Sequence, residues 1–266
     1  MRVNDRPGSR LPLDRDRIAA SDLPRLRVEV VQQAASTNAL VAARARAGEP
    51  DGLVVVAEHQ TAGRGRLDRS WETPANAALT FSVLVRAEVL PERWPWLPLL
   101  TGVAVSAGVE AVGGPACVLK WPNDVLHDGR KLAGILAERI QTPSGSAGVV
   151  GLGLNVSQSQ EELPVPTAGS LATTGHHAVD RTDLLLGILR ELERRLTQWS
   201  RGDDRVAGEY LQRMDTLGRR VRVLLPGGDS VEGLAVGVSH HGALELETVQ
   251  GRRTVSAGDV VHVRPA

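Results

Sequence analysis

A change in hydrophobic patterning near residue 216 constrains the fold of this chain more than any other feature. After it, short alternating runs of apolar and polar residues follow one another, separated by turns that contain glycine. These runs are 219–225, 230–238, 243–247, 252–256 and 260–263. Several short strands at close, regular spacing are typical of a small β-barrel. The pattern therefore predicts a boundary near residue 216, with a small barrel over residues 217–266.

Residues 26–216 contain longer segments, some with the hydrophobic period of a strand and others with that of a helix. Strands are predicted at 26–31, 53–58, 77–86, 117–120, 124–127, 131–140 and 147–156, and helices at 37–47, 97–112, 182–199 and 205–214. Ser36 is a plausible N-cap of the first helix. The pattern predicts an α+β fold. Residues 1–25 mix Arg, Asp and Pro without a clear period, and we expect a poorly ordered N-terminal arm there.

Composition excludes several classes of protein. Lys plus Arg and Asp plus Glu number 31 each, so no global charge favours DNA or a membrane surface. The single cysteine cannot form an intramolecular disulfide or a cysteine-rich zinc site. No apolar run is long enough to span a membrane. The charged residues at the N-terminus are not followed by the apolar segment of a signal peptide. We therefore expect a cytoplasmic protein with no DNA and no membrane partner.

Lysine is rare in this chain. The only two lysines are Lys120 and Lys131, so 29 of the 31 basic residues are arginine. An ammonium is a compact point charge, whereas a guanidinium is a planar fork, and a retained lysine is therefore a candidate for a place where arginine will not serve. Both lysines lie close to the segment Trp121-Pro122-Asn123-Asp124. One interpretation is chance, and the other is a polar site assembled from several segments.

A loop rich in glycine and arginine runs from Gly63 to Trp71, with the sequence Gly-Arg-Gly-Arg-Leu-Asp-Arg-Ser-Trp. Its glycines let the backbone turn and present N–H groups to an anion, and its arginines supply charge for carboxylate or phosphate oxygens. Trp71 offers a flat face for a nucleobase. The alternative is a basic surface loop, or a loop that touches RNA.

The segment Lys120–Asp124 and the strand that begins at Lys131 admit two interpretations as well. Asp124 could contact a metal ion or a polar donor, but Asn-Asp is also ordinary turn chemistry. Lys131 precedes the apolar run Leu132–Leu136. It could extend to solvent from the end of a strand, or direct its charge into a pocket.

Together these segments are far more specific than any one of them, and they resemble biotin protein ligases. The family pattern G-R-G-R-x-x-R-x-W stands at Gly63–Trp71, K-W-P-N-D at Lys120–Asp124 and K-[LVI]-[AG]-G-I-L at Lys131–Leu136. Gly151–Val156 resembles the later G-x-G-x-N strand. The order and spacing match over roughly residues 28–264. The resemblance implies a mixed-sheet catalytic domain with packed helices, similar to class II synthetases, followed by an SH3-like barrel.

The resemblance also implies a set of site residues. Lys131 and Arg66 would be catalytic. The biotin-binding set would be Ser36, Thr37, Asn38, Gln60, Gly63, Arg64, Gly65, Arg66, Lys131 and Gly134. The ATP and adenylate set would be Arg64, Arg66, Arg69, Trp71, Asn123, Lys131 and Asn155. ATP would be accompanied by Mg²⁺, with Asp124 as the protein's contact to the metal.

The reaction implied by the resemblance has two steps, formation of biotinyl-5′-AMP from biotin and ATP, and transfer of biotin to a lysine of a carboxylase carrier domain. Only about 25 residues precede the first strand, so we expect no DNA-binding repressor domain. Two other functions stay open. One is a lipoate–protein ligase, which would not need the polar set around Ser36 and Gln60. The other is a non-catalytic module that binds RNA or protein through the Gly63–Trp71 loop.

Overall fold

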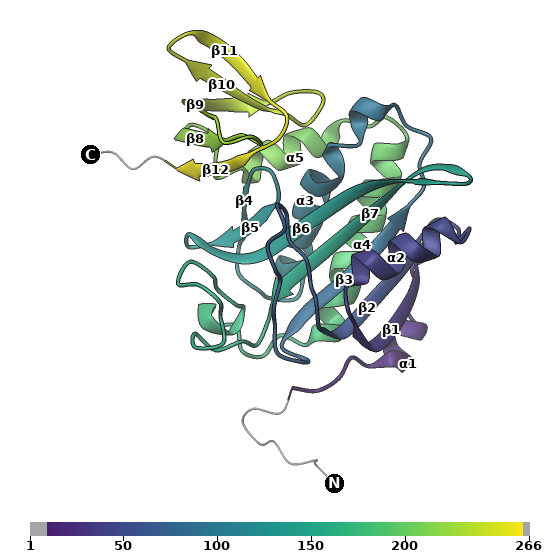
Figure 1. Ribbon diagram of the computed structural model, residues 1–266. Helices are drawn as coiled ribbons and strands as arrows, with labels where there is room; N and C mark the ends of the chain where they lie inside the picture. The colour runs from purple at the N-terminus through teal and green to yellow at the C-terminus, as the bar shows by residue number, and fades with distance from the viewer. Residues whose placement is uncertain (1–9, 263–266) are drawn as a thin grey trace.

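The computed structural model describes residues 10–262, which form two β-sheets and the helices packed on the larger one (Figure 1). The larger sheet has seven strands in the order β1-β2-β3-β7-β6-β5-β4. Its strands are β1 (Arg27–Ala34), β2 (Leu53–Gln60), β3 (Ala78–Val85), β4 (Val118–Lys120), β5 (Asp124–His127), β6 (Arg130–Thr142) and β7 (Gly145–Asn155). The sheet is mixed, because β1 and β2 run parallel while the other neighbours are antiparallel.

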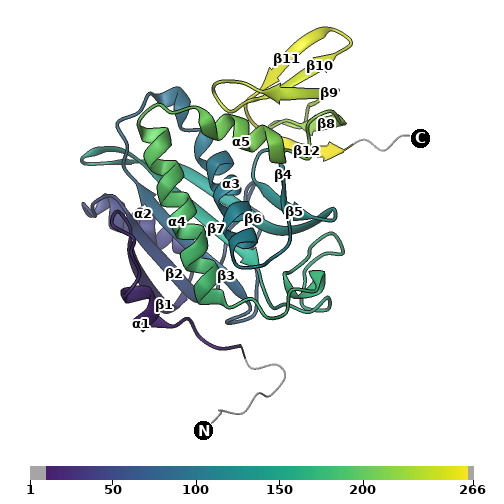
Figure 2. The same cartoon turned by 180° about the vertical axis from the view of Figure 1, so that it is seen from behind.

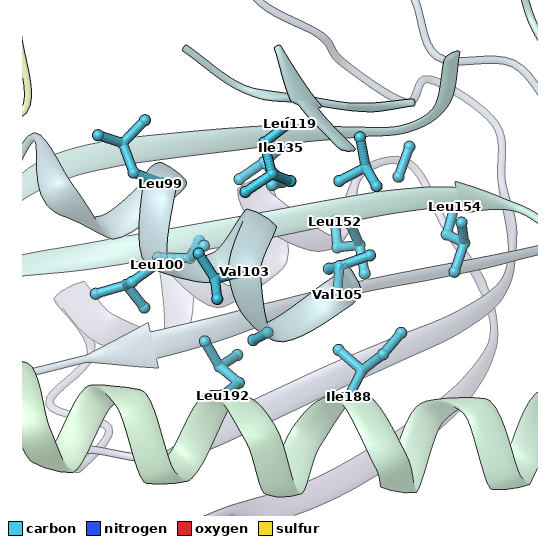
Figure 3. Close-up of a cluster of buried hydrophobic side chains, with 14 of the residues drawn as sticks. Leu99, Leu100, Val103, Val105, Leu119, Ile135, Leu152, Leu154, Ile188 and Leu192 are labelled. Atoms are coloured by element: carbon cyan, nitrogen blue, oxygen red, sulfur yellow. The ribbon is translucent and has the colours of Figure 1, made fainter. Parts of the chain in front are cut away.

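Helices cover both faces of this sheet. Helix α2 (Thr37–Arg46) lies on one face, and α3 (Trp96–Ala111) and α4 (Arg181–Ser200) lie on the other, as Figure 2 shows from behind. Helix α3 is apolar on most sides because it lies between the sheet and α4. Figure 3 shows Leu100 and Val103 of α3 between Leu152 of β7 and Leu192 of α4. Burial of these side chains supplies the main driving force for the domain.

The second sheet contains the last five strands, in the order β11-β10-β9-β8-β12. Its strands are β8 (Arg220–Leu224), β9 (Ser230–Val238), β10 (Leu244–Thr248), β11 (Gly251–Val255) and β12 (Asp259–His262), and every pairing is antiparallel. Helix α5 (Arg205–Arg213) precedes it and contacts both α3 and β9. The expected α+β class, a mixed sheet with packed helices followed by a small β domain, is confirmed. No helix within residues 10–262 combines the length and the apolarity needed to span a membrane.

The expectation of a poorly ordered arm is wrong for residues 10–25, while residues 1–9 lie outside the described part of the chain. This segment contains α1 (Arg15–Ala19), capped by the side chain of Asp14. Leu13 and Ile18 are buried, and the backbone N–H of Leu13 donates to Oε1 of Glu58 over 2.6 Å. The segment is ordered by contacts with β2 and α4, and a local period in the sequence does not register contacts of that kind.

Two 3₁₀ turns, Pro91–Arg93 and Ala172–Thr174, were also absent from the predicted elements. The predicted helices and strands otherwise lie where the sequence placed them, with ends that differ by a few residues. Ser36 is the N-cap of α2, and its side chain accepts from the backbone N–H of Ala39. Because α2 begins there, its first turn is directed against β2 and β3 and brings three polar residues to the sheet.

Candidate active site

A network of buried hydrogen bonds lies where α2 begins. The backbone N–H and the hydroxyl of Thr37 both donate to Oε1 of Gln60, over 2.7 and 3.0 Å. Oγ of Ser82, on β3, lies 2.7 Å from Oγ1 of Thr37 and 2.6 Å from Oδ1 of Asn38. Ser36, Thr37 and Asn38 are each about nineteen-twentieths buried, with 5, 3 and 4% of their surface exposed. Because hydrogen bonds hold these buried polar groups in place, they form a wall of the site that can hydrogen-bond to a polar ligand.

The network continues across the sheet to the loop rich in glycine and arginine. Nδ2 of Asn38 donates to the carbonyl oxygen of Leu136 over 3.1 Å and to Oε2 of Glu138 over 2.7 Å. The same carboxylate lies 3.0 Å from Nη2 of Arg64. Glu138 therefore joins the polar wall to the loop. Local patterns could not predict this link, because Glu138 lies far from both partners along the chain.

The loop from Gly63 to Trp71 closes on itself. The N–H of Gly65 donates to the carbonyl oxygen of Arg69 over 2.7 Å, and the N–H of Trp71 donates to that of Gly63 over 2.8 Å. A Cβ atom at Gly63 would lie 2.3 Å from the carbonyl oxygen of Trp71, so only glycine fits there. These hydrogen bonds fold the loop back on itself and so hold its arginines and Trp71 over the sheet.

Trp71 lies against glycines of the two central strands. A Cβ atom at Gly153 of β7 would lie 2.3 Å from Cε2 of Trp71, and one at Gly134 of β6 would lie 3.3 Å from Cζ3. Nζ of Lys131 lies 6.0 Å from the centroid of the indole. Nε1 of Trp71 is buried and makes no hydrogen bond with any described residue. The glycines thus form a flat floor on which a planar group can lie.

The two predicted polar segments meet beside this floor. Nζ of Lys131 lies 2.5 Å from Oδ1 of Asp124, which is an ion pair by distance although the two groups are not aligned as a hydrogen bond. Oδ1 of Asn123 accepts from Nη1 of Arg66 over 3.1 Å, and its Nδ2 donates to the carbonyl oxygen of Ile135 over 3.0 Å. Burial lowers the pKa of the Arg66 guanidinium, and nearby Asp124 opposes that shift.

The C-terminal domain contributes to the same place. Nη2 of Arg66 donates to the carbonyl oxygen of Gly258 over 3.2 Å, and its Nη1 lies 3.8 Å from Oδ1 of Asp259. Asp259 also forms an ion pair with Arg69. Asp259 stands at the start of β12, 190 residues from Arg69 along the chain. The structure thus adds a carboxylate to the site that sequence reasoning missed.

A cavity of about 740 Å³ brings these groups together, within the size range of small-molecule sites. Of the predicted site residues, its lining includes Ser36, Thr37, Asn38, Gln60, Arg64, Gly65, Arg66, Arg69, Trp71, Asn123, Asp124, Lys131, Gly134 and Asn155. Gly63 lies instead on a neighbouring cavity of about 640 Å³ behind the loop. Lys120, Gly151 and Gly153, which belong to the motifs but not to the predicted ligand sets, also line the main cavity, as do Leu136, Asp259, Val260 and Val261.

The hydrogen-bonding groups of the Asn155 side chain are already paired within the protein. Nδ2 of Asn155 donates to the carbonyl oxygen of Gly169, and its Oδ1 accepts from Gln158, each over 2.9 Å.

Within residues 10–262 no group of three or more His, Cys, Asp or Glu side chains is placed to hold a metal ion. Asp124 therefore offers a metal one carboxylate at most, which suits an ion held mainly by phosphate oxygens and water.

Comparison with known proteins gives consistent results for both domains. Residues 30–155 match the model of the biotin/lipoate A/B protein ligase family, and residues 216–263 match the biotin protein ligase C-terminal domain. The chain is 45% identical to the biotin–[acetyl-CoA-carboxylase] ligase of Mycobacterium tuberculosis, over 98% of this chain and 100% of that protein.

Solved structures give the same answer. The biotin protein ligase of Aquifex aeolicus in complex with biotin and ATP superposes with a TM-score of 0.75 at 28% identity, covering 90% of this chain and 99% of that one. The Leishmania major enzyme in complex with biotinyl-5-AMP gives a TM-score of 0.57 at 26% identity, covering 86% and 98%. With its catalytic and C-terminal domains both matched and a close relative aligned over its full length, this chain belongs to the biotin protein ligase family.

Proposed function

We propose that this chain attaches biotin to protein in two steps. Biotin and ATP first give biotinyl-5′-AMP and pyrophosphate, and biotin is then transferred to a specific lysine of a carboxylase carrier domain. The observation that carries the proposal is one cavity that joins a buried hydrogen-bonding wall at Thr37 and Gln60 to a cationic end at Lys131 and Arg66. Biotin has the matching chemistry, a neutral ureido ring at one end and a carboxylate at the other.

The wall suits the ureido ring. That ring carries N–H donors and a carbonyl acceptor, and Ser36, Thr37, Asn38 and Gln60 offer both kinds of partner from fixed positions. These side chains are already held by one another, so little ordering is needed when the ring binds. A ligand without such groups, such as lipoate, could form none of these hydrogen bonds with the wall, so the site should favour biotin over it.

The cationic end suits the reacting groups. The obstacle to adenylation is the approach of two anions, biotin's carboxylate and the α-phosphate of ATP. Lys131 and Arg66 would screen both, with Arg64 in the lining of the same cavity. Gly134 leaves room beside Lys131, because a Cβ there would lie 3.2 Å from its Nζ. These groups stabilise charge in the transition state and need transfer no proton.

The nucleotide would lie beside Trp71, whose indole packs on Gly134 and Gly153. Trp71 provides an aromatic face, Arg69 a charge for phosphate oxygens, and Asn123 and Asn155 amide groups on the cavity wall. Support for this placement is the meeting of all four side chains in one cavity that Lys131 also lines. The adenine and phosphate ends would therefore be held by separate groups, which orients the α-phosphorus for attack.

Magnesium would accompany ATP. Asp124 is the residue that would hold it, together with phosphate oxygens and water. When bound, the ion would neutralise phosphate charge and so favour departure of pyrophosphate. Asp124 is also paired with Lys131, so the carboxylate that would contact the ion lies beside the central cation.

The test is exchange of labelled pyrophosphate into ATP by the purified protein with Mg²⁺, first without any carrier domain. Exchange that depends on biotin and is not supported by lipoate is the expected result. Exchange with lipoate alone would replace the proposal by a lipoate ligase. No exchange with either compound from folded protein would overturn adenylation and leave a binding module. The carboxylase carrier, the cytoplasmic location and the absence of a DNA partner stay predictions.

A further inference from the structure

Arg10, which precedes α1, binds a loop that lies far from it along the chain. Its Nε donates to Oγ of Ser157 over 3.1 Å. Its Nη2 donates to the carbonyl oxygen of Ser157 over 3.1 Å and to Oε2 of Glu162 over 2.5 Å. Both partners belong to the loop 157–169, which follows β7. The N-terminal segment is therefore attached to this loop as well as to β2 and α4.

The backbone next to Arg10 is itself held by buried partners. The carbonyl oxygen of Leu11 accepts from Nη2 of Arg181 over 2.8 Å, and the N–H of Leu13 donates to Oε1 of Glu58 over 2.6 Å. Arg181 and Glu58 are both buried. Because these bonds fix the chain on one side of Arg10, its side chain acts on the loop from a fixed point.

The loop reaches the main cavity soon after the residue that Arg10 contacts. The N–H of Ser159 donates to Oε2 of Glu162 over 2.9 Å, so the carboxylate bound by Arg10 also closes a turn of the loop. Leu163 is buried next to it. The residues of the loop that line the cavity are Pro164, Val165, Thr167 and Ala168. A displacement of Glu162 would therefore be passed to the cavity wall within a few residues.

The same loop holds the backbone of Lys131. The N–H of Lys131 donates to the carbonyl oxygen of Thr167 over 2.8 Å, and its carbonyl oxygen accepts from the N–H of Gly169 over 2.9 Å. The carbonyl oxygen of Gly169 also accepts from Nδ2 of Asn155 over 2.9 Å. The end of the loop thus lies beside two residues of the proposed nucleotide set. A small displacement of such groups can cost much of the rate, even when its cause lies far from the reacting atoms.

We propose that Arg10 is a positioning residue for the nucleotide end of the site, which it orders by fixing the loop 157–169 through Ser157 and Glu162. The proposal rests on the proposed adenylation. Arg10 itself lies outside both cavities, so it acts on ATP through the loop. Among residues 10–262 no hydrogen bond joins this loop to Thr37 or Gln60, and the biotin wall is therefore independent of it.

The ion pair that carries this role is present at neutral pH. The Arg10 guanidinium, and after it the N–H of Ser159, hold the pKa of Glu162 below its ordinary value. The side chains of Arg10 and Glu162 are 24% and 34% exposed, so water screens the pair in part. A moderate effect on ATP is therefore expected, and the experiment needs a control that loses a comparable pair.

Arg10→Gln removes the charge, and Arg17→Gln is the matched control. Arg17 lies in the same segment and pairs with Asp180 and Asp183 at the start of α4, away from the loop. Relative to the control, Arg10→Gln should bind ATP about three- to fivefold more weakly by calorimetry, the range of a partly exposed ion pair. Its affinity for biotin should be unchanged. Undiminished ATP binding would overturn the assignment. A lower unfolding midpoint with equal losses for ATP and biotin would also overturn it, since Arg10 would then only stabilise the fold.

A double-mutant cycle tests the route through the loop. Glu162→Gln keeps an acceptor for Ser159 and should weaken ATP binding as Arg10→Gln does. The double variant should lose no more than either single variant, and additive losses would show that the two residues act separately. In biotin-dependent pyrophosphate exchange the KM for ATP should rise while the KM for biotin does not, and Arg10→Lys should restore part of the loss. Failure of the unaltered protein to catalyse exchange would refute the proposed function, whereas the binding measurements would still decide the role of Arg10.

Discussion

Replacing Glu58 by glutamine tests how the N-terminal segment is held to the catalytic domain. Both carboxylate oxygens of Glu58 accept hydrogen bonds, Oε1 from the backbone N–H of Leu13 over 2.6 Å and Oε2 from Nη2 of Arg181 over 2.7 Å. The side chains of this ion pair are 3% and 8% exposed. An amide has only one acceptor, so in Glu58→Gln one of the two donors faces an N–H group whichever way the amide turns.

The size of the expected loss of stability follows from the burial of the ion pair between Glu58 and Arg181. Breaking a buried ion pair by neutralising one partner costs about 3–5 kcal/mol, because the remaining charge is left without compensation. Arg181 keeps its bonds to the carbonyl oxygens of Ala78 and Leu11, which satisfy donors but do not neutralise the charge. For domains of this size each kcal/mol moves the midpoint of thermal unfolding by about 2–4 °C. A decrease of roughly 6–20 °C is therefore expected for the variant.

Thermal unfolding followed by tryptophan fluorescence measures the effect, and Glu232→Gln is the matched control. Glu232 pairs with Arg222 on the surface, with 51% and 54% of the side chains exposed, and its loss should cost less than about 1 kcal/mol. In the double variant Glu58→Leu/Arg181→Met, part of the lost stability should return, because no charge remains buried. A midpoint for Glu58→Gln equal to that of the control would refute the reasoning.

Four further outcomes follow from the site. Lys131→Ala should lower the rate of adenylate formation by about 10²–10³-fold with an unchanged unfolding midpoint, and near-normal turnover would show the central cation to be elsewhere. Arg66→Gly should loosen the loop, which we expect to close over the adenylate, and speed release of biotinyl-5′-AMP into solution; slower release would contradict this. Gln60→Leu should weaken binding of biotin but not of ATP, as measured by calorimetry, because Thr37 loses the acceptor for two buried donors. Burial raises the pKa of the Cys117 thiol to about 12, so at pH 8 it stays protonated and should react with a disulfide reagent only after unfolding.

Local pattern was sufficient for most of the fold. The largely apolar β2 and β3, the small residues of α3 and the alternating strands after residue 216 carry their own signals, since each depends on which faces of one element are buried. The prediction failed for the segment before β1, because its order depends on contacts with distant parts of the chain. Leu13 and Ile18 are too few and too far apart to show a period, and their burial depends on α4, which lies more than 150 residues later.

The same distinction separates the parts of the site. Short motifs located the loop at Gly63–Trp71, the segment ending at Asp124 and the strand that begins at Lys131, because each keeps its chemistry within a few residues. Glu138 and Ser82 could not be found in this way. They are ordinary strand residues, and they matter only because sheet register places them against Asn38. Motifs thus identify the groups proposed to contact the ligand, while topology decides which groups hold them in place.

Asp259 shows what this means for the loop. Its carboxylate is paired with Arg69 and lies 3.8 Å from Arg66, so the C-terminal domain holds the same arginines that the proposed reaction directs toward phosphate. An anion that engages Arg69 must compete with this carboxylate, and a ligand with several charges competes better than one with a single charge. We therefore expect ATP to compete for Arg69 better than AMP does, because ATP brings more negative charge against the pairing with Asp259. We therefore predict that the second domain affects which nucleotide the loop accepts, although nothing in its own sequence marks it as part of the site.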